Sequence, residues 1–274
     1  MREENRNGEI WLDCSRCGKM FKAYDAGTSF ASLLAAIYSK DDMRLCQECA
    51  DADCAEKEAQ RIEQEKTDYQ NRLADMAIDN GVPRGYIFHR ETGKLIEEPL
   101  KPEVFNWIWR NRNHNLLLTA KTGEGKSTSA CMAAVRLIAE GKHVRYAKLL
   151  NLLFEWRNVK KSDDRYALDR FFSTIGFLDV LIIDEAADKT VISESGNEMM
   201  FELLDRVYDG ELQTKVWITG NFRGGALKEL FGDDDPVYRR LEENFIIGGI
   251  QDSGAVKRIH VFKDSVRKRH ETLS

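Results

Sequence analysis

Residues 116–128, LLLTAKTGEGKST, decide the fold of this chain. The apolar run at residues 116–118 predicts a buried parallel strand, and the apolar periodicity of residues 127–139 predicts a helix. The glycine-bearing turn between them is typical of a phosphate-binding loop, because glycines let backbone amides face a polyphosphate and the helix N-terminus adds its positive dipole end. The alternative, a chance glycine-rich turn, is disfavoured by this strand–turn–helix context.

Within this loop the residue types indicate separate tasks. Lys126 is placed to reach the β- and γ-phosphates of a nucleotide, and the Ser127 hydroxyl is placed to bind magnesium. Ala120 stands where a glycine is usual, and its methyl group is the mildest replacement. The predicted nucleotide-binding residues are Ala120, Lys121, Thr122, Gly123, Glu124, Gly125, Lys126, Ser127 and Thr128.

The composition limits the classes of protein to consider. The 274 residues suit one or two domains, and a hydrophobic content of 42% with 32% charged residues is that of a soluble globular protein. The net charge of −5 argues against non-specific nucleic-acid binding by the whole surface but allows a local basic groove. The apolar runs are too short to cross a bilayer and no signal peptide opens the chain. We therefore expect a cytoplasmic protein with reduced thiols and no membrane partner.

Four of the six cysteines form two CxxC pairs separated by 28 residues, Cys14, Cys17, Cys46 and Cys49. In a reducing compartment this pattern predicts a four-thiolate zinc site, and two unrelated pairs are the alternative. Cys54 is a spare thiol or a competitor of Cys49 for the fourth ligand position. Cys131 is interpreted as a small core residue. The insert between the pairs contains SFASLLAAIY, residues 29–38, where we expect a short helix.

Residues 55–79 predict a helix, because they are rich in helix formers and lack glycine and proline. We interpret this stretch as a solvated helical linker, since we see no sustained heptads that would make a coiled-coil face. Asn80-Gly81 and then Pro83 are typical of a helix end. The predicted domains are a zinc-binding module at residues 1–54, a linker at 55–80 and a nucleotide-binding domain at 81–274.

A second nucleotide signature follows about 60 residues after the phosphate loop. The apolar run at residues 177–183 predicts a buried strand that ends in Asp184-Glu185. Asp184 can then join Ser127 in holding magnesium, and Glu185 can polarise an attacking water. Alone, this pair would be an acidic strand end facing solvent; together with a phosphate loop it predicts a hydrolytic site.

Strand and helix patterns alternate along the rest of the chain. Strands are predicted at residues 144–147 and 215–219, and helices at 104–109, 149–157, 163–174, 195–208, 224–231 and from Pro236. A hairpin is predicted from residues 245–250 and 258–262, and a solvated basic tail from 263–270. Asn221, after the 215–219 strand, can orient water or simply form a turn. The expected fold is a three-layer α/β sandwich with a mostly parallel sheet, a P-loop NTPase.

With these motifs assembled, the chain resembles AAA+ ATPases of the bacterial and phage helicase-loader type (DnaC-like) and their relatives, the IstB-like transposition helpers. The resemblance covers residues 81–250. It rests on AKTGEGKST as Walker A, VLIIDE as Walker B, WITGN as the sensor strand with Asn221, and DPVYRRLEEN as the arginine-finger helix. Loaders carry Asp-Arg-Leu in that helix, whereas this chain has Arg239-Arg240-Leu241. The resemblance therefore implies Arg240 as the trans-acting arginine, with Arg239 as a competitor.

The resemblance implies an ATPase that uses ATP and Mg²⁺, with Lys126, Asp184, Glu185, Asn221 and Arg240 as catalytic residues. Hydrolysis would be slow and would depend on assembly or DNA, because an arginine from the next subunit reads the γ-phosphate. The implied partners are a hexameric replicative helicase, single-stranded DNA and further copies of the chain. Two alternatives stay open, a transposition helper that assembles on double-stranded DNA and a nucleotide-gated scaffold without significant hydrolysis. The zinc module suits docking of a protein slightly better than DNA, and a phage origin is as compatible as a bacterial one.

Overall fold

The structure is a computed structural model, and it describes residues 3–6, 9–22, 45–89, 92–93, 95–96, 98–186, 194–221, 236–250 and 255–258. The chain divides into two compact units, residues 1–69 and 70–274, and the division falls within one long helix. The predicted helices at residues 29–38 and 224–231 and the basic tail lie outside the described residues.

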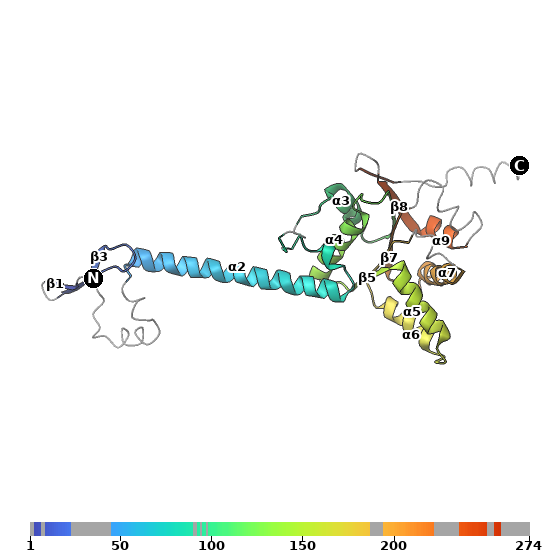
Figure 1. The fold of residues 1–274 in the computed structure, drawn as a ribbon, viewed down its shortest axis with the longest axis horizontal. Helices are drawn as coiled ribbons and strands as arrows, with labels where there is room; N and C mark the ends of the chain where they lie inside the picture. Colours follow the sequence, from blue (N-terminus) through green and yellow to red (C-terminus); the bar gives the residue numbers. More distant parts are fainter. Residues whose placement is uncertain are drawn as a thin grey trace, which may run out of the picture. The chain divides into compact units, whose positions relative to one another are not determined.

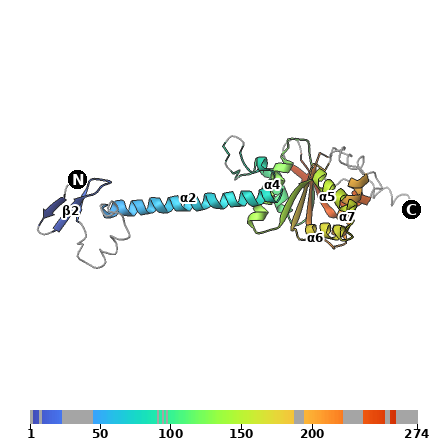
Figure 2. The same ribbon diagram turned by 60° about the horizontal axis from the view of Figure 1, so that its bottom comes forward.

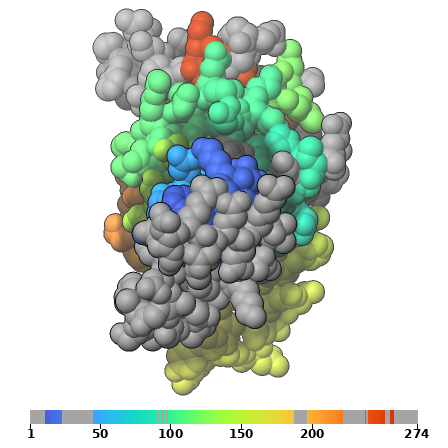
Figure 3. Space-filling model, turned by 90° about the vertical axis from the view of Figure 1, so that its left-hand side faces the viewer, coloured from blue at the N-terminus to red at the C-terminus, as the bar shows by residue number. Residues whose placement is uncertain are grey.

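The first unit contains a small antiparallel sheet and the start of the long helix. Strands β1 (Glu3–Arg6), β2 (Glu9–Asp13) and β3 (Met20–Lys22) pair in the order β1-β2-β3. The first CxxC pair occupies the turn between β2 and β3. The described residues of these strands appear in blue in Figure 3.

Helix α2 (Gln47–Asp79) is the predicted linker helix, and it begins eight residues before the predicted start (Figure 1). The added residues, 47–54, also lack glycine and proline, so nothing in them stops a helix. The end is as predicted. Gly81, with φ of 88°, donates its N–H to the Ile78 carbonyl, and Val82 donates to the Ala77 carbonyl, which satisfies the last carbonyls of the helix.

The second unit is organised around a six-stranded sheet. Its strands are β4 (Asn115–Thr119), β5 (Val144–Lys148), β6 (Val180–Asp184), β7 (Lys215–Gly220), β8 (Phe245–Ile250) and β9 (Val256–Arg258). The spatial order is β5-β6-β7-β4-β8-β9, and every pairing is parallel except the antiparallel β8–β9 hairpin. The mostly parallel sheet predicted from the sequence is confirmed.

Alternation along the strands separates two hydrophobic cores, one on each face of the sheet. On one face, Leu116, Leu118 and Ile182 pack against helices α3 (Pro102–Arg110) and α4 (Lys126–Ala139). The opposite face, with Leu117 and Ile183, is covered by α5 (Leu149–Lys161), α6 (Ala167–Gly176), α7 (Glu194–Tyr208) and α9 (Pro236–Asn244). Figure 2 shows α4 on one side of the sheet and α5, α6 and α7 on the other, so the three-layer prediction is confirmed.

The bounds of several elements differ from prediction for local reasons. The apolar run at residues 177–183 forms a strand only from Val180, because Phe177 still caps α6. Helix α6 begins at Ala167 rather than at residue 163, where Asp164 instead accepts a bond from the Tyr166 amide in a turn. Pro236 opens α9 as predicted.

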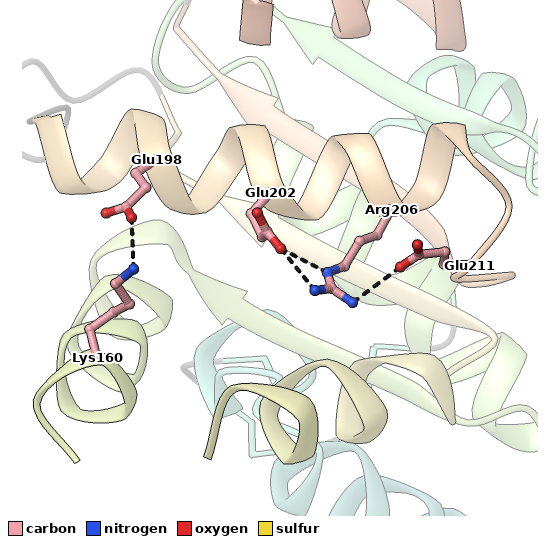
Figure 4. Close-up of polar contacts among 5 residues, drawn as sticks. All are labelled: Lys160, Glu198, Glu202, Arg206 and Glu211. Carbon is pink, nitrogen blue, oxygen red and sulfur yellow. Dashed lines mark hydrogen bonds and ion pairs between the residues drawn. The ribbon is translucent and has the colours of Figure 1, made fainter. Parts of the chain in front are cut away.

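One ion pair links helices α5 and α7, and a second group of charged side chains lies along α7 and the turn after it (Figure 4). Lys160 of α5 bonds Glu198 of α7 at 2.8 Å, and Arg206 bonds Glu202 at 2.9 Å and Glu211 at 3.1 Å. Such partly exposed pairs contribute little stability each, at most about 1 kcal/mol. The buried apolar residues beneath them therefore do most to hold this layer on the sheet.

Candidate functional site

The phosphate loop lies where parallel strand β4 meets helix α4. Gly123 and Gly125 take φ angles of 90° and 81°, which side-chain-bearing residues rarely adopt. Gly125 is the N-cap of α4, and no side chain bonds the free amides of that helix start. Ala120 does not have a positive φ, so alanine in place of the usual glycine causes no backbone strain. The loop can therefore present its amides to a polyphosphate.

The Lys126 side chain is folded back over this loop. Its Nζ donates to the carbonyl oxygens of Ala120 at 2.8 Å and Lys121 at 2.7 Å. The residue is buried, and burial lowers the pKa of its ammonium group, although Asp184 and Glu124 oppose this. A nucleotide phosphate would offer this desolvated cation a stronger, charged acceptor than a carbonyl.

Asp184 is the centre of the site, and it lies buried at the carboxyl end of β6. Its Oδ1 accepts bonds from the Ser127 hydroxyl at 2.9 Å, from the Thr219 hydroxyl, and from the Glu185 amide at 2.9 Å. Its Oδ2 accepts a bond from the Tyr146 hydroxyl. Four donors thus hold one carboxylate against the phosphate loop. The oxygens of Ser127 and Asp184 are close enough to belong to one magnesium shell, so the residues present fit that ion.

Tyr146 and Thr219 were not among the site residues predicted from the sequence. They come from β5 and β7, the two strands that flank β6. Tyr146 lies two residues before Lys148, which pairs with Asp184, and Thr219 directly follows Ile218, which pairs with Ile183. Burial, with the Asp184 charge as a further cause, raises the pKa of Tyr146, so its hydroxyl keeps its proton and remains a donor. The available signal was a polar residue near the end of each apolar strand, but only the strand order shows which carboxylate they meet.

Replacing Tyr146 by phenylalanine removes one donor from a buried carboxylate. We expect the free energy of unfolding to fall by about 1.5–3 kcal/mol, since hydrogen bonds to charged groups contribute in that range. Chemical denaturation measures this. Tyr166→Phe is the control, because Tyr166 is exposed on the surface before α6. Equal stability of the two variants would show that the Tyr146 hydroxyl does not matter for holding Asp184.

Glu185 follows Asp184 in an unusual conformation. It is the one non-glycine residue with a positive φ, 58°, in the described part of the chain. The next residue, Ala186, donates its amide to the Thr219 carbonyl at 3.0 Å, which fixes the turn. The half-exposed carboxylate of Glu185 pairs with Lys148 at 2.8 Å. Such backbone strain is typical of functional sites, and it brings a second carboxylate beside Asp184.

The remaining predicted residues lie on two elements. Asn221 is exposed and directly follows β7. The last residue of β7, Gly220, accepts a hydrogen bond from the Ala120 amide at 3.4 Å, so Asn221 follows a strand that ends beside the phosphate loop. Arg240 of α9 is not free. Its Nε donates to Asp205 of α7 at 2.9 Å, and its guanidinium stacks on Tyr208 at 4.3 Å from the ring centre. Arg239, the preceding residue, is exposed.

The four cysteines of the two CxxC pairs come together in the first unit. Their sulfur atoms all lie within 4.8 Å of one another, and the sulfurs of Cys17 and Cys46 are 3.7 Å apart. Tetrahedral thiolates at about 2.3 Å from a zinc ion would stand roughly 3.8 Å apart, so the cluster fits this geometry. Cys54, exposed on α2, is not a member of the cluster.

Backbone geometry prepares this cluster. Gly18 turns the chain with φ of 71°, and its amide donates to the Cys14 carbonyl at 2.9 Å. The Cys46 amide donates to the sulfur of Cys14 at 3.4 Å, and this bond lowers the pKa of Cys14 to about 6. The side chain of Cys46 raises the pKa of Cys49 to about 12. Cys14 is therefore more readily ionised than Cys49, and the thiolate is the form that binds a metal ion.

The sequence profile of the IstB-like ATP binding proteins matches residues 54–243, which include the phosphate loop and the Asp184 cluster. The chain belongs to this family. A relative, the ATP-binding protein of insertion sequence IS1162 from Pseudomonas fluorescens, is 28% identical over 116 residues, which are 42% of this chain and 48% of that protein. The match thus spans about half the length of this relative.

Solved structures of replication proteins are also similar. The DnaC helicase loader matches with a TM-score of 0.45 and 14% identity, over 62% of this chain and 97% of that one. AMPPCP-bound DnaA from Aquifex aeolicus matches with a TM-score of 0.44 and 18% identity, over 58% and 49% of the two chains. None of the described helices is long and apolar enough to span a membrane.

Proposed function

We propose that this protein is a magnesium-dependent ATPase that acts as a switch in DNA replication, loading a replicative helicase onto single-stranded DNA. The observation that carries the ATPase part is the meeting of Ser127 and Asp184 at 2.9 Å between the phosphate loop and β6. An acidic strand end that only faces solvent would be exposed, whereas Asp184 is buried and accepts four hydrogen bonds. A divalent cation and a polyphosphate explain both the carboxylate and the loop.

Each residue has a distinct task in this proposal. The amides of Gly123 to Gly125 bind the phosphates, and Lys126 exchanges its loop carbonyls for phosphate oxygens. Magnesium, when bound, neutralises phosphate charge. Glu185, once it is released from Lys148, accepts a hydrogen bond from the attacking water, and Asn221 orients it. The zinc ion proposed for the four thiols stabilises the first unit rather than taking part in this chemistry.

The arginine that reaches a neighbouring subunit is proposed to be Arg239. Arg240 is held by Asp205 and Tyr208, so Arg240→Ala should lower the free energy of unfolding by about 1 kcal/mol through its lost pair. Arg239→Ala should leave stability unchanged and reduce DNA-stimulated hydrolysis by roughly 100-fold or more. Thermal melting and phosphate release separate the two effects. Loss of stimulated hydrolysis in the Arg240 variant alone would reverse the assignment.

The loader part of the proposal rests on the first unit. The unit built around the four-cysteine cluster has few basic residues, and two of them, Arg16 and Lys19, are paired with glutamates of α2. Such a surface suits docking to a protein better than binding to DNA. The partner proposed for it is a replicative helicase hexamer, with single-stranded DNA as the second ligand.

A second candidate is a transposition helper that assembles on double-stranded DNA. The observation that favours it is the match to the IS1162 ATP-binding protein, whose name places it in an insertion sequence. The two functions share the nucleotide site and differ in partner. A scaffold that binds ATP without hydrolysing it differs from both in turnover.

Size-exclusion chromatography with and without Mg·ATP separates these functions. We expect the full chain to co-elute with the host's replicative helicase, and a chain with all four cluster cysteines changed to serine to elute alone. No helicase complex, but ATP-dependent filaments on duplex DNA, would establish the transposition helper. ATP binding without phosphate release on any DNA would support the third function, a nucleotide-gated scaffold.

A further inference from the structure

Three large apolar side chains lie exposed on α2. Ile62 is 56%, Tyr69 51% and Met76 50% exposed. They are seven residues apart, so they share one face of the helix with little angular drift. Single exposed apolar residues are ordinary, but three in register on one helix are not.

Together with residues between and before them, these side chains recur along the helix at alternating spacings of three and four residues. Ala52, Ala55 and Ala59 precede Ile62, and Leu73 lies between Tyr69 and Met76. Lys66 is the one polar member of this face, which we call the α2 seam. No sustained heptads are recognised in this stretch when its alanines are counted only as helix formers. Small residues at these positions also let a second helix approach closely.

Among the described residues, the seam positions before Leu73 are exposed to solvent, whereas Leu73 is partly buried against the core of the second unit. No residue from Gln47 to Leu73 is buried, and the first buried residue of α2 is Ala74. Helix propensity alone gives such a bare stretch marginal stability in water. An amphipathic helix of this kind gains stability when its apolar face is covered.

Charge decides what can cover it. The positions flanking the seam include Asp51, Glu56, Glu58, Glu63 and Glu65. Helix α2 as a whole carries ten acidic residues against four basic ones, a charge of −6, so the chain's net charge of −5 resides in this helix. Two copies of α2, parallel or antiparallel, would place glutamates opposite glutamates, which is unfavourable.

We propose that the α2 seam binds an amphipathic helix of a partner protein, one that repeats apolar residues every three and four positions and carries lysine or arginine beside them. Ile62 and Tyr69 supply the apolar anchors, and Glu58 and Glu63 select the basic flanks. This inference does not depend on ATP hydrolysis or on the identity of the helicase.

The test uses the full-length protein and a labelled four-heptad peptide with leucine at its seam and lysine beside it. We expect saturable binding, weakened at least tenfold by Ile62→Ser with Tyr69→Ser and weakened less by Glu58→Gln with Glu63→Gln. The control, Gln60→Ser with Asn71→Ser, changes the opposite face of the helix and should bind as the unchanged protein does. Circular dichroism checks that the helix content of every variant is retained.

Three results would overturn the proposal. The first is absence of binding. The second is equal binding of a scrambled peptide of the same composition, or full binding by the Ile62 and Tyr69 variant, because charge alone would then explain the affinity. The third is self-association of the protein that rises with salt and is lost in the Ile62 and Tyr69 variant. Salt screens the glutamates, so that result would make a second copy the occupant.

Discussion

Glu185→Gln should slow ATP hydrolysis by roughly 100-fold or more and leave ATP binding intact. The variant keeps the size of the side chain, but its neutral amide cannot polarise the attacking water as the carboxylate does. Loss of such a group lowers the rate on the order of 100-fold or more. Asp184, Ser127 and Lys126 are untouched, so the nucleotide still binds. Phosphate release with DNA present measures the rate, and a fluorescent ATP analogue measures the affinity.

Glu198→Gln is the matched control for that variant. Glu198 is also a half-exposed glutamate paired with a lysine, Lys160, but it lies on α7. Hydrolysis by the control should equal that of the unchanged protein. If Glu185→Gln still hydrolysed ATP at the normal rate, another residue would have to position the water, and the proposed role of Glu185 would be lost.

Loss of the four-cysteine cluster should unfold the first unit and spare the second. In Cys14→Ser with Cys46→Ser the remaining two thiols cannot complete a tetrahedral site. Structural zinc contributes an apparent binding free energy of about 10–16 kcal/mol in small modules, so little else would hold this small sheet together. We expect no bound zinc and rapid proteolysis before α2, with ATP binding unchanged.

Cys54→Ser provides the comparison, because Cys54 is an exposed thiol outside the cluster. It should retain one zinc per chain and the protease resistance of the unchanged protein. If the unchanged protein, purified without chelator, held no zinc, the four sulfurs would have to be explained as a reduced, metal-free cluster.

Local patterns made much of this protein predictable from its sequence. The phosphate loop is a continuous stretch, and Asp184 ends an apolar run, so strand, turn and helix could each be recognised without knowing the fold. The four cysteines were equally accessible, because the spacing of a CxxC pair itself indicates two ligands on one turn. These features depend on neighbours in the sequence.

Features that depend on strand order or helix phase could not be predicted. Tyr146 and Thr219 reach Asp184 only because β6 lies between β5 and β7. Arg240 faces α7 because Val237 and Leu241 turn inward on the same helix, which leaves Arg239 outside. The α2 seam was missed for a different reason, since alanine is both a helix former and a seam residue.

Titration of ATP into the full-length protein and its Lys126→Ala variant, each with magnesium and with chelator, tests the central claim most directly. The unchanged protein should bind ATP more tightly with magnesium, and the variant should bind at least about 100-fold more weakly, since losing charge-assisted bonds worth about 3 kcal/mol corresponds to that factor. Equal affinities for the two proteins, unaffected by magnesium, would contradict a nucleotide site built from the phosphate loop and Asp184.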